Sequence, residues 1–498
     1  MLAKKNILII PPTISTNDLQ MTKRGADHNW WSPHYGVIRL TDYLNKNGHN
    51  AEYFDSIVQL LTKEDNFEKK LKEKKWDIIG FSLLNTTLIS DIENIYLAKK
   101  ICPDATLVAG GFEAQFNYQT VLDKTPCKIV VLAEGEKPLL MLANEVPLGD
   151  IPGIIFRNDA VPLSDEDYMD ISECIGWEEI PYEQYWDLYL EKLGDGVSEE
   201  KKDAIHTARI FTTNRCPFKC KYCSTINQHP HATGGDASIV RLQNDYLIDL
   251  VLRIKKAHPR LRTIYFTDDD FCYHKSKVID FCKRVSSLKL GVQFLCQTRI
   301  TDLNEEVIMW LKKAGFRQLN IGIESFSQNV LAEIDKKCPK DKMLENLDLL
   351  EKYDLHAGMF MILITPKSSL EDIEETVDET LKRIKEGVCS AGATLACEPL
   401  KGTHFYEHNY DFMTEIQKIK GTNHVIKKDI MIHAEDPIVR EVQLRHYREI
   451  EEYTEKQTKT EKVFHKTNFN KAEISLNFLK ELIADVRKKY NLIHKKSA

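Results

Sequence analysis

The chain has 498 residues, enough for about three domains at ~150 residues each. Its 42% hydrophobic content permits packed cores, and its formal net charge of −7 gives no sign of a nucleic-acid partner. The longest apolar runs have strand length, so no membrane span is expected. The first residues do not resemble a signal peptide, and twelve cysteines without an export signal do not predict disulfides. We therefore expect a cytoplasmic protein.

Residues 1–148 alternate short apolar runs with amphipathic stretches, which predicts a doubly wound α/β domain with a parallel sheet. Ligands of such sheets bind beyond the carboxyl ends of the strands, so the residues that follow the apolar runs are candidates. Among them are Ser82, Leu83, Gly110 and Gly111. The two glycines permit close backbone approach to a ligand, and a tight strand-to-helix turn is an equally good reading. The predicted strands are Ile7–Ile10, Ala51–Phe54, Ile78–Phe81, Leu107–Ala109 and Ile129–Leu132.

Residues 149–204 do not continue this alternation. Residues 154–162 predict a hairpin that turns around Asn158 and Asp159. The sequence that follows is acidic and rich in aromatic residues, such as Trp177 and Tyr185. We interpret this range as a linker that packs between two domains.

Three cysteines follow the next predicted strand with the spacing C-x3-C-x2-C: Cys216, Cys220 and Cys223. Three thiolates this close together can hold three irons of a [4Fe–4S] cluster, and the fourth iron then stays open to a small molecule. An open coordination position indicates catalysis rather than structural ligation. Two alternatives are a zinc site with His229 or His231 and a set of buried thiols. The spacing fits no common zinc finger.

Six strand–helix units run through residues 205–400 and predict a partial (β/α)6 barrel. The predicted strands are Arg209–Thr212, Thr263–Phe266, Val292–Cys296, Gln318–Ile321, Ala357–Leu363 and Ala393–Cys397.

Polar side chains follow several of these strands, where the active sites of such barrels lie. Arg299 can bind a carboxylate with its planar guanidinium, and Glu324, followed by Ser325, can accept hydrogen bonds from hydroxyl or ammonium groups. Asp268 and Asp269 are further candidates. Their alternative role, shared with Asp270, is to stabilise a helix N-terminus, and we expect at least one of the three to do only that.

Residues 401–498 contain few strand signals. Two helices are predicted, at Asp436–Lys456 and Ala472–Lys489, separated by a polar, basic connection. We expect a small helical C-terminal domain.

The cysteine loop, with Tyr222 before its last cysteine, resembles that of the radical S-adenosylmethionine (SAM) superfamily. The resemblance implies that the three cysteines hold a [4Fe–4S] cluster whose open iron binds SAM. It also implies that Asp268, Asp269, Arg299, Glu324 and Ser325 lie around SAM. An electron donor such as flavodoxin or ferredoxin would then reduce the cluster and cleave SAM to a 5′-deoxyadenosyl radical.

The N-terminal domain resembles the cobalamin-binding domain found upstream of many radical SAM enzymes. The matching segments include residues 6–12, 76–82, 108–111 and 133–136. The resemblance implies that Ser82, Leu83, Gly110 and Gly111 line the groove for the nucleotide tail of cobalamin. Two features depart from the usual pattern: no Asp-x-His-x-x-Gly motif is present, and Phe112-Glu113 stand where Pro-His is common.

Taken together, the resemblances imply a cobalamin-dependent radical SAM enzyme, most often a methyltransferase acting at an unreactive carbon of a small-molecule or peptide substrate. One alternative is radical rearrangement, oxidation or coupling without methyl transfer. Another is a non-catalytic metal or cobalamin sensor.

Overall fold

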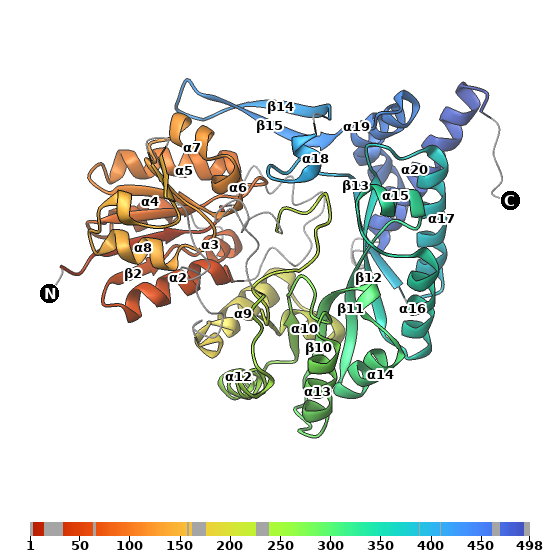
Figure 1. The fold of residues 1–498 in the computed structure, drawn as a ribbon, viewed down its shortest axis with the longest axis horizontal. Coiled ribbons are helices and arrows are strands. Elements are labelled where there is room, and N and C mark those ends of the chain that lie inside the picture. Colours follow the sequence, from red (N-terminus) through yellow and green to blue (C-terminus); the bar gives the residue numbers. More distant parts are fainter. Residues whose placement is uncertain are drawn as a thin grey trace.

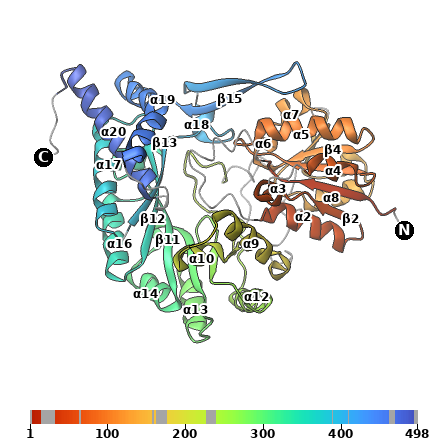
Figure 2. The same ribbon diagram turned by 180° about the vertical axis from the view of Figure 1, so that it is seen from behind.

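The computed structural model describes residues 3–13, 33–62, 66–156, 159–161, 176–225, 239–387, 389–408, 410–460 and 469–492, and all structural statements refer to these. An N-terminal α/β domain lies beside a second, larger α/β unit, and two C-terminal helices and a hairpin lie along one side of the molecule (Figures 1 and 2). The α/β fold class predicted from the sequence is therefore confirmed.

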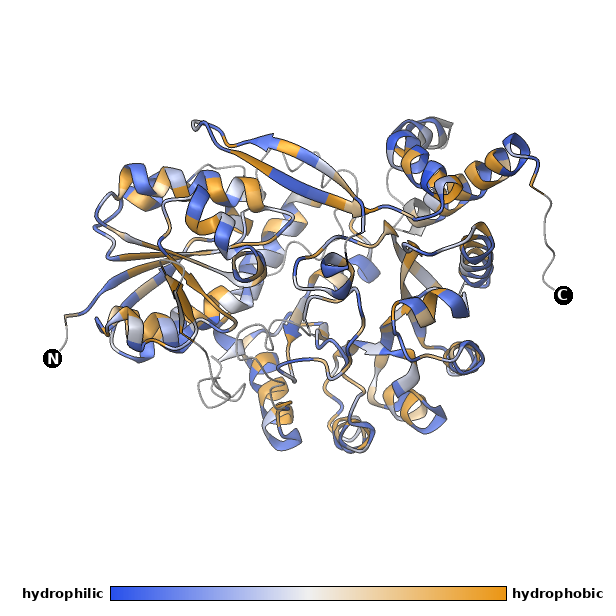
Figure 3. Ribbon diagram, turned by 45° about the horizontal axis from the view of Figure 1, so that its top comes forward, coloured by the Kyte–Doolittle hydropathy of each residue, from blue (hydrophilic) through white to orange (hydrophobic). Residues whose placement is uncertain are grey.

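The N-terminal sheet has seven strands in the order β2-β1-β3-β4-β5-β6-β7, and its first five strands are parallel. Alternate residues of these strands face opposite sides, and each side is covered by helices. Helices α2 and α8 pack on one face, and α4 to α7 pack on the other. The strands of this domain are largely hydrophobic, whereas its helices carry hydrophilic residues on their outer sides (Figure 3). The strands are β1 (Asn6–Ile10), β2 (Asn50–Tyr53), β3 (Ile78–Ser82), β4 (Thr106–Gly110), β5 (Ile129–Val131), β6 (Ile154–Phe156) and β7 (Asp159–Val161). The helices are α2 (Tyr35–Lys46), α3 (Ser56–Thr62), α4 (Phe67–Lys72), α5 (Leu88–Ile101), α6 (Gly111–Phe116), α7 (Tyr118–Lys124) and α8 (Glu136–Ala143).

The predicted linker contains two parts with different roles. Its hairpin, β6 and β7, pairs antiparallel with β5 and extends the N-terminal sheet, so this part belongs to the first domain. Helices α9 (Tyr182–Leu193) and α10 (Glu199–Ile205) follow. The Tyr185 hydroxyl of α9 donates a hydrogen bond to Asp55 of the N-terminal domain, and Trp186 packs in the core of the second unit. The aromatic residues of α9 therefore lie at an interface, as predicted.

The second unit is built on six parallel strands in the order β13-β12-β11-β10-β9-β8. Every predicted strand of the partial barrel overlaps an observed one. The strands are β8 (Thr207–Ile210), β9 (Thr263–Phe266), β10 (Gln293–Arg299), β11 (Phe316–Glu324), β12 (His356–Ile364) and β13 (Cys389–Ala396). The helices are α12 (Asn244–Ala257), α13 (Lys275–Ser286), α14 (Glu305–Ala314), α15 (Gln328–Glu333), α16 (Lys340–Lys352) and α17 (Leu370–Lys385).

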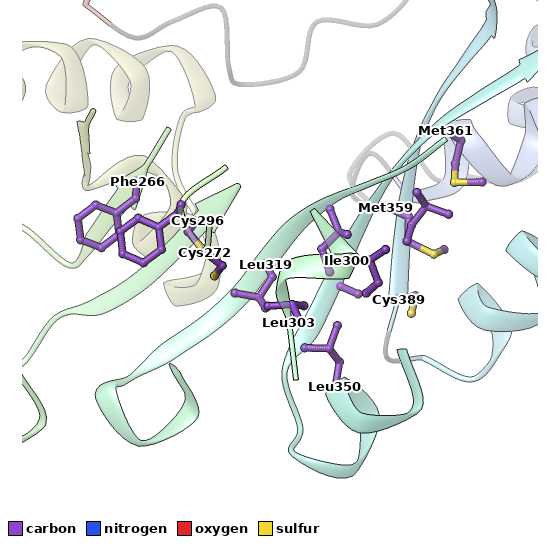
Figure 4. Packing of buried hydrophobic residues seen from close by; sticks show 14 of the residues in the cluster. Phe266, Cys272, Cys296, Ile300, Leu303, Leu319, Leu350, Met359, Met361 and Cys389 are labelled. Carbon is purple, nitrogen blue, oxygen red and sulfur yellow. The ribbon is translucent and has the colours of Figure 1, made fainter. Parts of the chain in front are cut away.

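The core between these strands and helices is closely packed. Phe266 stacks on Phe271 with 4.5 Å between ring centroids, and Cys272 and Cys296 are fully buried beside this cluster (Figure 4). Seven of the nine cysteines outside the C-x3-C-x2-C loop are buried, Cys102 is half-buried, and Cys174 lies outside the described residues. Their interpretation as small core residues is thus largely confirmed.

The C-terminal region is helical in α19 (Pro437–Thr460) and α20 (Phe469–Lys489), as predicted, and a short helix α18 (His404–Glu407) precedes them. No sequence signal had indicated the antiparallel hairpin formed by β14 (Phe412–Lys418) and β15 (Val425–Ile432). This hairpin extends from the second unit toward α5 of the N-terminal domain (Figures 1 and 2). Among the described residues, no helix is both long enough and apolar enough to cross a membrane.

Candidate active site

A cavity of about 150 Å³ opens at the carboxyl ends of the parallel strands β8 to β12. The C-x3-C-x2-C loop forms one wall, and residues from β10, β11 and β12 form the others. The chain thus brings the three cysteines together with most of the predicted polar residues. The lining residues are Cys216, Phe218, Cys220, Tyr222, Cys223, Asp269, Gln297, Thr298, Arg299, Asn320, Gly322, Glu324, Lys336 and Phe360.

The cysteine loop is tied to its surroundings by backbone hydrogen bonds. The Lys221 amide donates to the Ile334 carbonyl at 3.0 Å, and the Cys223 amide donates to the Cys220 carbonyl at 3.1 Å. Burial raises the pKa of Cys216 to about 12. A thiol in this position is a poor anion by itself, so a thiolate here requires a compensating cationic group such as a metal cluster.

The donor set fits a [4Fe–4S] cluster better than a single metal ion. In a cubane cluster each thiolate binds a different iron, so the three sulfur atoms stand further apart than around one ion. Three thiols line one cavity, yet no group of three His, Cys, Asp or Glu in the described part of the chain has the geometry for a single ion. The histidines of the zinc alternative, His229 and His231, lie outside the described residues.

Of the predicted aspartates, Asp268 serves the scaffold. It is buried, and it accepts hydrogen bonds from the backbone amides and hydroxyls of Thr212 and Thr213 at 2.5–3.0 Å. It thereby joins the end of β9 to the start of the cysteine loop, and it does not line the cavity. Asp270 binds the Thr298 hydroxyl at 2.8 Å.

Asp269 is the aspartate that lines the cavity. Burial, followed by the charge of Asp268, raises the pKa of Asp269 to about 6, and a hydrogen bond from the Cys216 backbone opposes this shift. A carboxylate in such a setting is stabilised by a nearby positive group, which is the property expected of a partner for an ammonium ion.

Arg299 is only 4% exposed and connects three parts of the site. Its Nη1 lies 3.3 Å from Cys220 Sγ, its guanidinium lies 3.8 Å from the ring centre of Phe218, and its Nη2 donates to the Lys336 carbonyl. Arg299 Nε is buried without a hydrogen-bond partner among the described residues. Arg299 therefore contacts the cysteine loop directly and retains one donor group that can serve a ligand.

Glu324 forms a buried ion pair that the sequence analysis did not predict. Its Oε1 lies 2.8 Å from Lys336 Nζ and accepts a hydrogen bond from the Tyr222 hydroxyl at 2.8 Å. Glu324 adopts a φ of 66°, which is unusual for a residue other than glycine, next to a register shift in β11. Strain of this kind persists where the surrounding structure enforces it and is typical of functional sites.

Gly322 makes this ion pair possible. A Cβ atom at Gly322 would lie 2.5 Å from Glu324 Oε1 and 2.7 Å from Lys336 Nζ. Ser325, by contrast, is buried away from the cavity and shares a hydrogen bond of 2.6 Å with Thr376. Lys336 is thus a site residue that the strand-end rule missed, because it follows a short helix and not a strand. Tyr222 lies in the cysteine loop, but its hydrogen bond to Glu324 was not predicted.

The predicted cobalamin residues lie together at the carboxyl edge of the N-terminal sheet. Ser82, Gly110 and Gly111 are half-buried, so a ligand can reach them. Leu83 is fully buried; its amide donates to the Gly110 carbonyl, and its carbonyl accepts from the Glu113 amide. At the two glycines a cofactor can approach the backbone of this edge closely. Leu83 instead stabilises the edge through its two backbone hydrogen bonds.

Gly111 is needed for the fold of this edge as well. It has a φ of +85°, and a Cβ atom there would lie 2.9 Å from the Leu83 carbonyl and from Ser82 Oγ. Gly111→Val is therefore expected to destabilise the N-terminal domain and to lower cobalamin retention together. Gly110, whose Cβ would meet only Val131 at 3.8 Å or more, offers the cleaner test.

Gly110→Val is expected to lower cobalamin retention with little loss of domain stability, because an added Cβ meets no atom closer than 3.8 Å while position 110 lies at the carboxyl edge of the sheet. Cobalamin per chain after gel filtration and the thermal unfolding midpoint measure the two effects separately. Retention equal to that of the unmodified protein would place the cofactor elsewhere.

Arg299→Met is expected to weaken SAM binding by about 2–5 kcal/mol, since it removes a buried charged donor. Because Arg299 also contacts Cys220, the iron content must be measured in the same preparation. Titration of SAM by calorimetry under anaerobic conditions gives the affinity. If the affinity for SAM is unchanged at full iron content, Arg299 does not bind SAM and only stabilises the cysteine loop.

Comparison with known protein families matches the chain to the radical SAM superfamily over residues 210–380 and to the B12 binding domain over residues 33–143. The first range includes the cysteine loop and the strands that line the cavity, and the second includes the predicted cobalamin edge. The cofactors of these domains are a [4Fe–4S] cluster, SAM and cobalamin, in agreement with the prediction from sequence.

Two curated relatives illustrate the range of chemistry among similar proteins. An uncharacterised methyltransferase from Pyrococcus horikoshii is 25% identical over 409 residues, which cover 81% of this chain and 83% of the relative. The anaerobic magnesium-protoporphyrin IX monomethyl ester cyclase of Rubrivivax gelatinosus is 24% identical over 361 residues and covers 70% of this chain; the match spans 61% of the cyclase.

A solved structure shares the fold over nearly the whole chain. The cobalamin-dependent SAM radical enzyme OxsB, with aqua-cobalamin bound, has a TM-score of 0.66 at 14% identity, and the match covers 99% of this chain and 74% of OxsB. At this identity the similarity concerns the fold alone.

Proposed function

We propose that this chain, which joins a B12-binding domain to a radical SAM domain, is a cobalamin-dependent radical SAM methyltransferase that acts on an unreactive carbon. The observation that carries the proposal is the single cavity in which three cysteines lie with Arg299, Glu324, Lys336 and Asp269. This set combines soft thiol ligands with charged groups suited to the amino and carboxylate groups of an amino acid.

The residues of the chain have separate roles in this proposal. Cys216, Cys220 and Cys223 hold the cluster, and Arg299 supports Cys220 through its N–H group. Glu324 and Asp269 line the cavity and can accept hydrogen bonds from the ammonium group of SAM, while Lys336 and Arg299 Nε can donate to its carboxylate. When bound, these cofactors supply a 5′-deoxyadenosyl radical that abstracts hydrogen from the substrate and, from methylcobalamin, a methyl group.

Two observations favour methyl transfer. The presence of a B12-binding domain provides a methyl carrier, and a methyltransferase is among the relatives that match over most of the chain. The cyclase relative supports a second candidate, in which the substrate radical undergoes ring closure or oxidation without methyl transfer.

The two candidates differ in the products formed from SAM. Methyl transfer converts one SAM to S-adenosylhomocysteine to renew methylcobalamin and cleaves a second to 5′-deoxyadenosine. Reconstituted protein, incubated anaerobically with SAM, dithionite and added hydroxocobalamin, is expected to form both. Formation of 5′-deoxyadenosine without S-adenosylhomocysteine favours the second candidate, and formation of neither contradicts both.

A further inference from the structure

The turn that follows β13 contacts the N-terminal domain through Lys401. Lys401 Nζ donates a hydrogen bond to Asn117 Oδ1, and Asn117 Nδ2 donates to Glu113 Oε1 at 2.9 Å. Asn117 is buried, and its amide group acts as a donor on one side and as an acceptor on the other. A lysine of the second unit is thereby linked to a glutamate of α6.

Glu113 in turn belongs to the edge of the N-terminal sheet. Its amide donates to the Leu83 carbonyl at 3.2 Å, directly beside Gly111. The charge of Lys401 attracts Glu113, and the charge of Lys428 on β15 does so as well, whereas Asp429 repels it. The sequence departure at Glu113 therefore has a structural partner on the other side of the domain interface.

The residue next to Lys401 packs closely against the N-terminal domain. Gly402, with a φ of +79°, sits against the ring of Phe116 at the end of α6, and a Cβ atom there would lie 2.3 Å from that ring. Positions 401 and 402 thus meet α6 through a polar and an apolar contact respectively.

The hairpin β14–β15 makes a second contact with the same domain. Ile419 and Ile426 form a buried cluster with Leu88 and Ile92 of α5. The Lys420 amide donates to Glu93 at 3.0 Å. The hairpin crosses above α5 in both ribbon views (Figures 1 and 2).

We infer that Lys401 is a positioning residue. Through Asn117 and Glu113 it holds the carboxyl edge of the N-terminal sheet, where the predicted cobalamin residues lie, at a fixed place against the second unit. The hairpin provides the apolar half of the same attachment. The positioning of cobalamin rests on the proposed function, because it requires that this edge of the sheet binds cobalamin. The attachment of the two domains through Lys401 does not depend on any cofactor.

Hydrogen exchange of the full-length protein tests this attachment. Lys401→Met is expected to speed amide exchange about tenfold in α6 and in residues 412–432, because local opening of the interface becomes easier. Strands β9 to β11 are expected to exchange as before. Lys401→Arg, which keeps a charged donor, is expected to restore most of the protection.

Lys420→Met is the matched control, since Lys420 is an exposed lysine between β14 and β15 whose hydrogen bond to Glu93 comes from the backbone amide, which the substitution keeps. Exchange in α6 that is equal in Lys401→Met and Lys420→Met contradicts the inference. Faster exchange spread evenly over all strands also contradicts it, because the role is then general stability. If Lys401→Met does not fold, Glu113→Gln must reproduce the local pattern, and an unchanged pattern in that variant overturns the inference.

A second measurement concerns the cofactor. The rate at which bound cobalamin leaves the holoprotein is expected to rise about tenfold in Lys401→Met and to stay within about twofold in Lys420→Met. Equal release rates in the two variants contradict a role in positioning the cofactor edge. If the unmodified protein holds no cobalamin, the proposed function fails, whereas the exchange experiment still decides whether Lys401 attaches the domains.

Discussion

Replacing Cys216, Cys220 and Cys223 together with alanine is expected to remove all cluster iron and all 5′-deoxyadenosine formation. The three thiols line one cavity, and a cubane cluster held by three cysteines loses every protein ligand in this variant. Iron and sulfide analysis after anaerobic reconstitution, with product analysis after addition of SAM and dithionite, measures both effects.

Cys102→Ala is the matched control, because Cys102 lies half-buried in the N-terminal domain outside the cavity. This variant is expected to keep its iron and its activity. A triple variant that still cleaves SAM would show that the cluster is held by other residues.

Lys336→Met is expected to destabilise the second unit by roughly 3–5 kcal/mol, because it leaves the carboxylate of Glu324 buried without its cationic partner. The Glu324 side chain is 7% exposed and that of Lys336 is 5% exposed, so water cannot replace the lost charge. The midpoint of the urea transition, followed by circular dichroism on cofactor-free protein, measures the effect.

The neighbouring Lys337 provides the control for this prediction. Its side chain is 72% exposed and pairs with Asp335 at the surface, so Lys337→Met is expected to change stability by less than about 1 kcal/mol. Adding Glu324→Gln to Lys336→Met removes the unpaired charge and is expected to recover part of the loss. Equal midpoints for the two lysine variants would contradict the importance of the buried pair.

The sequence predicted the N-terminal sheet well because strands such as β1, β3 and β5 are almost wholly buried and appear as continuous apolar runs. Strands β10 and β11 of the second sheet bury alternate residues along much of their length, and the regular alternation of strand and helix segments predicted them. Strand β9 was predicted with its observed bounds. The hairpin β14–β15 gave no such signal. About half of its residues are half-exposed, and Ile416 and Val425 lie open to solvent. Of its few buried residues, Ile419 and Ile426 pack against α5, which is far away in the sequence.

The candidate site was predicted in part for a similar reason. Residues at the carboxyl ends of strands, such as Arg299 and Glu324, are identified by the rule that barrel active sites lie there. The rule does not identify Lys336, because this residue lines the cavity from the segment that follows helix α15. Asp268 satisfies the rule but is used to join β8 to β9, which spacing alone does not reveal.

The ultraviolet–visible spectrum of anaerobically reconstituted protein, with iron, sulfide and cobalamin counted per chain, tests the central claim most directly. We predict a brown iron–sulfur absorbance that fades on exposure to air, about four irons and about four sulfides per chain, and about one cobalamin with its own visible bands. A protein that assembles no cluster, or that binds zinc in its place, would contradict the assignment of the cavity as a radical SAM site. A full cluster without cobalamin would contradict the proposed methyl transfer while leaving the cavity assignment intact.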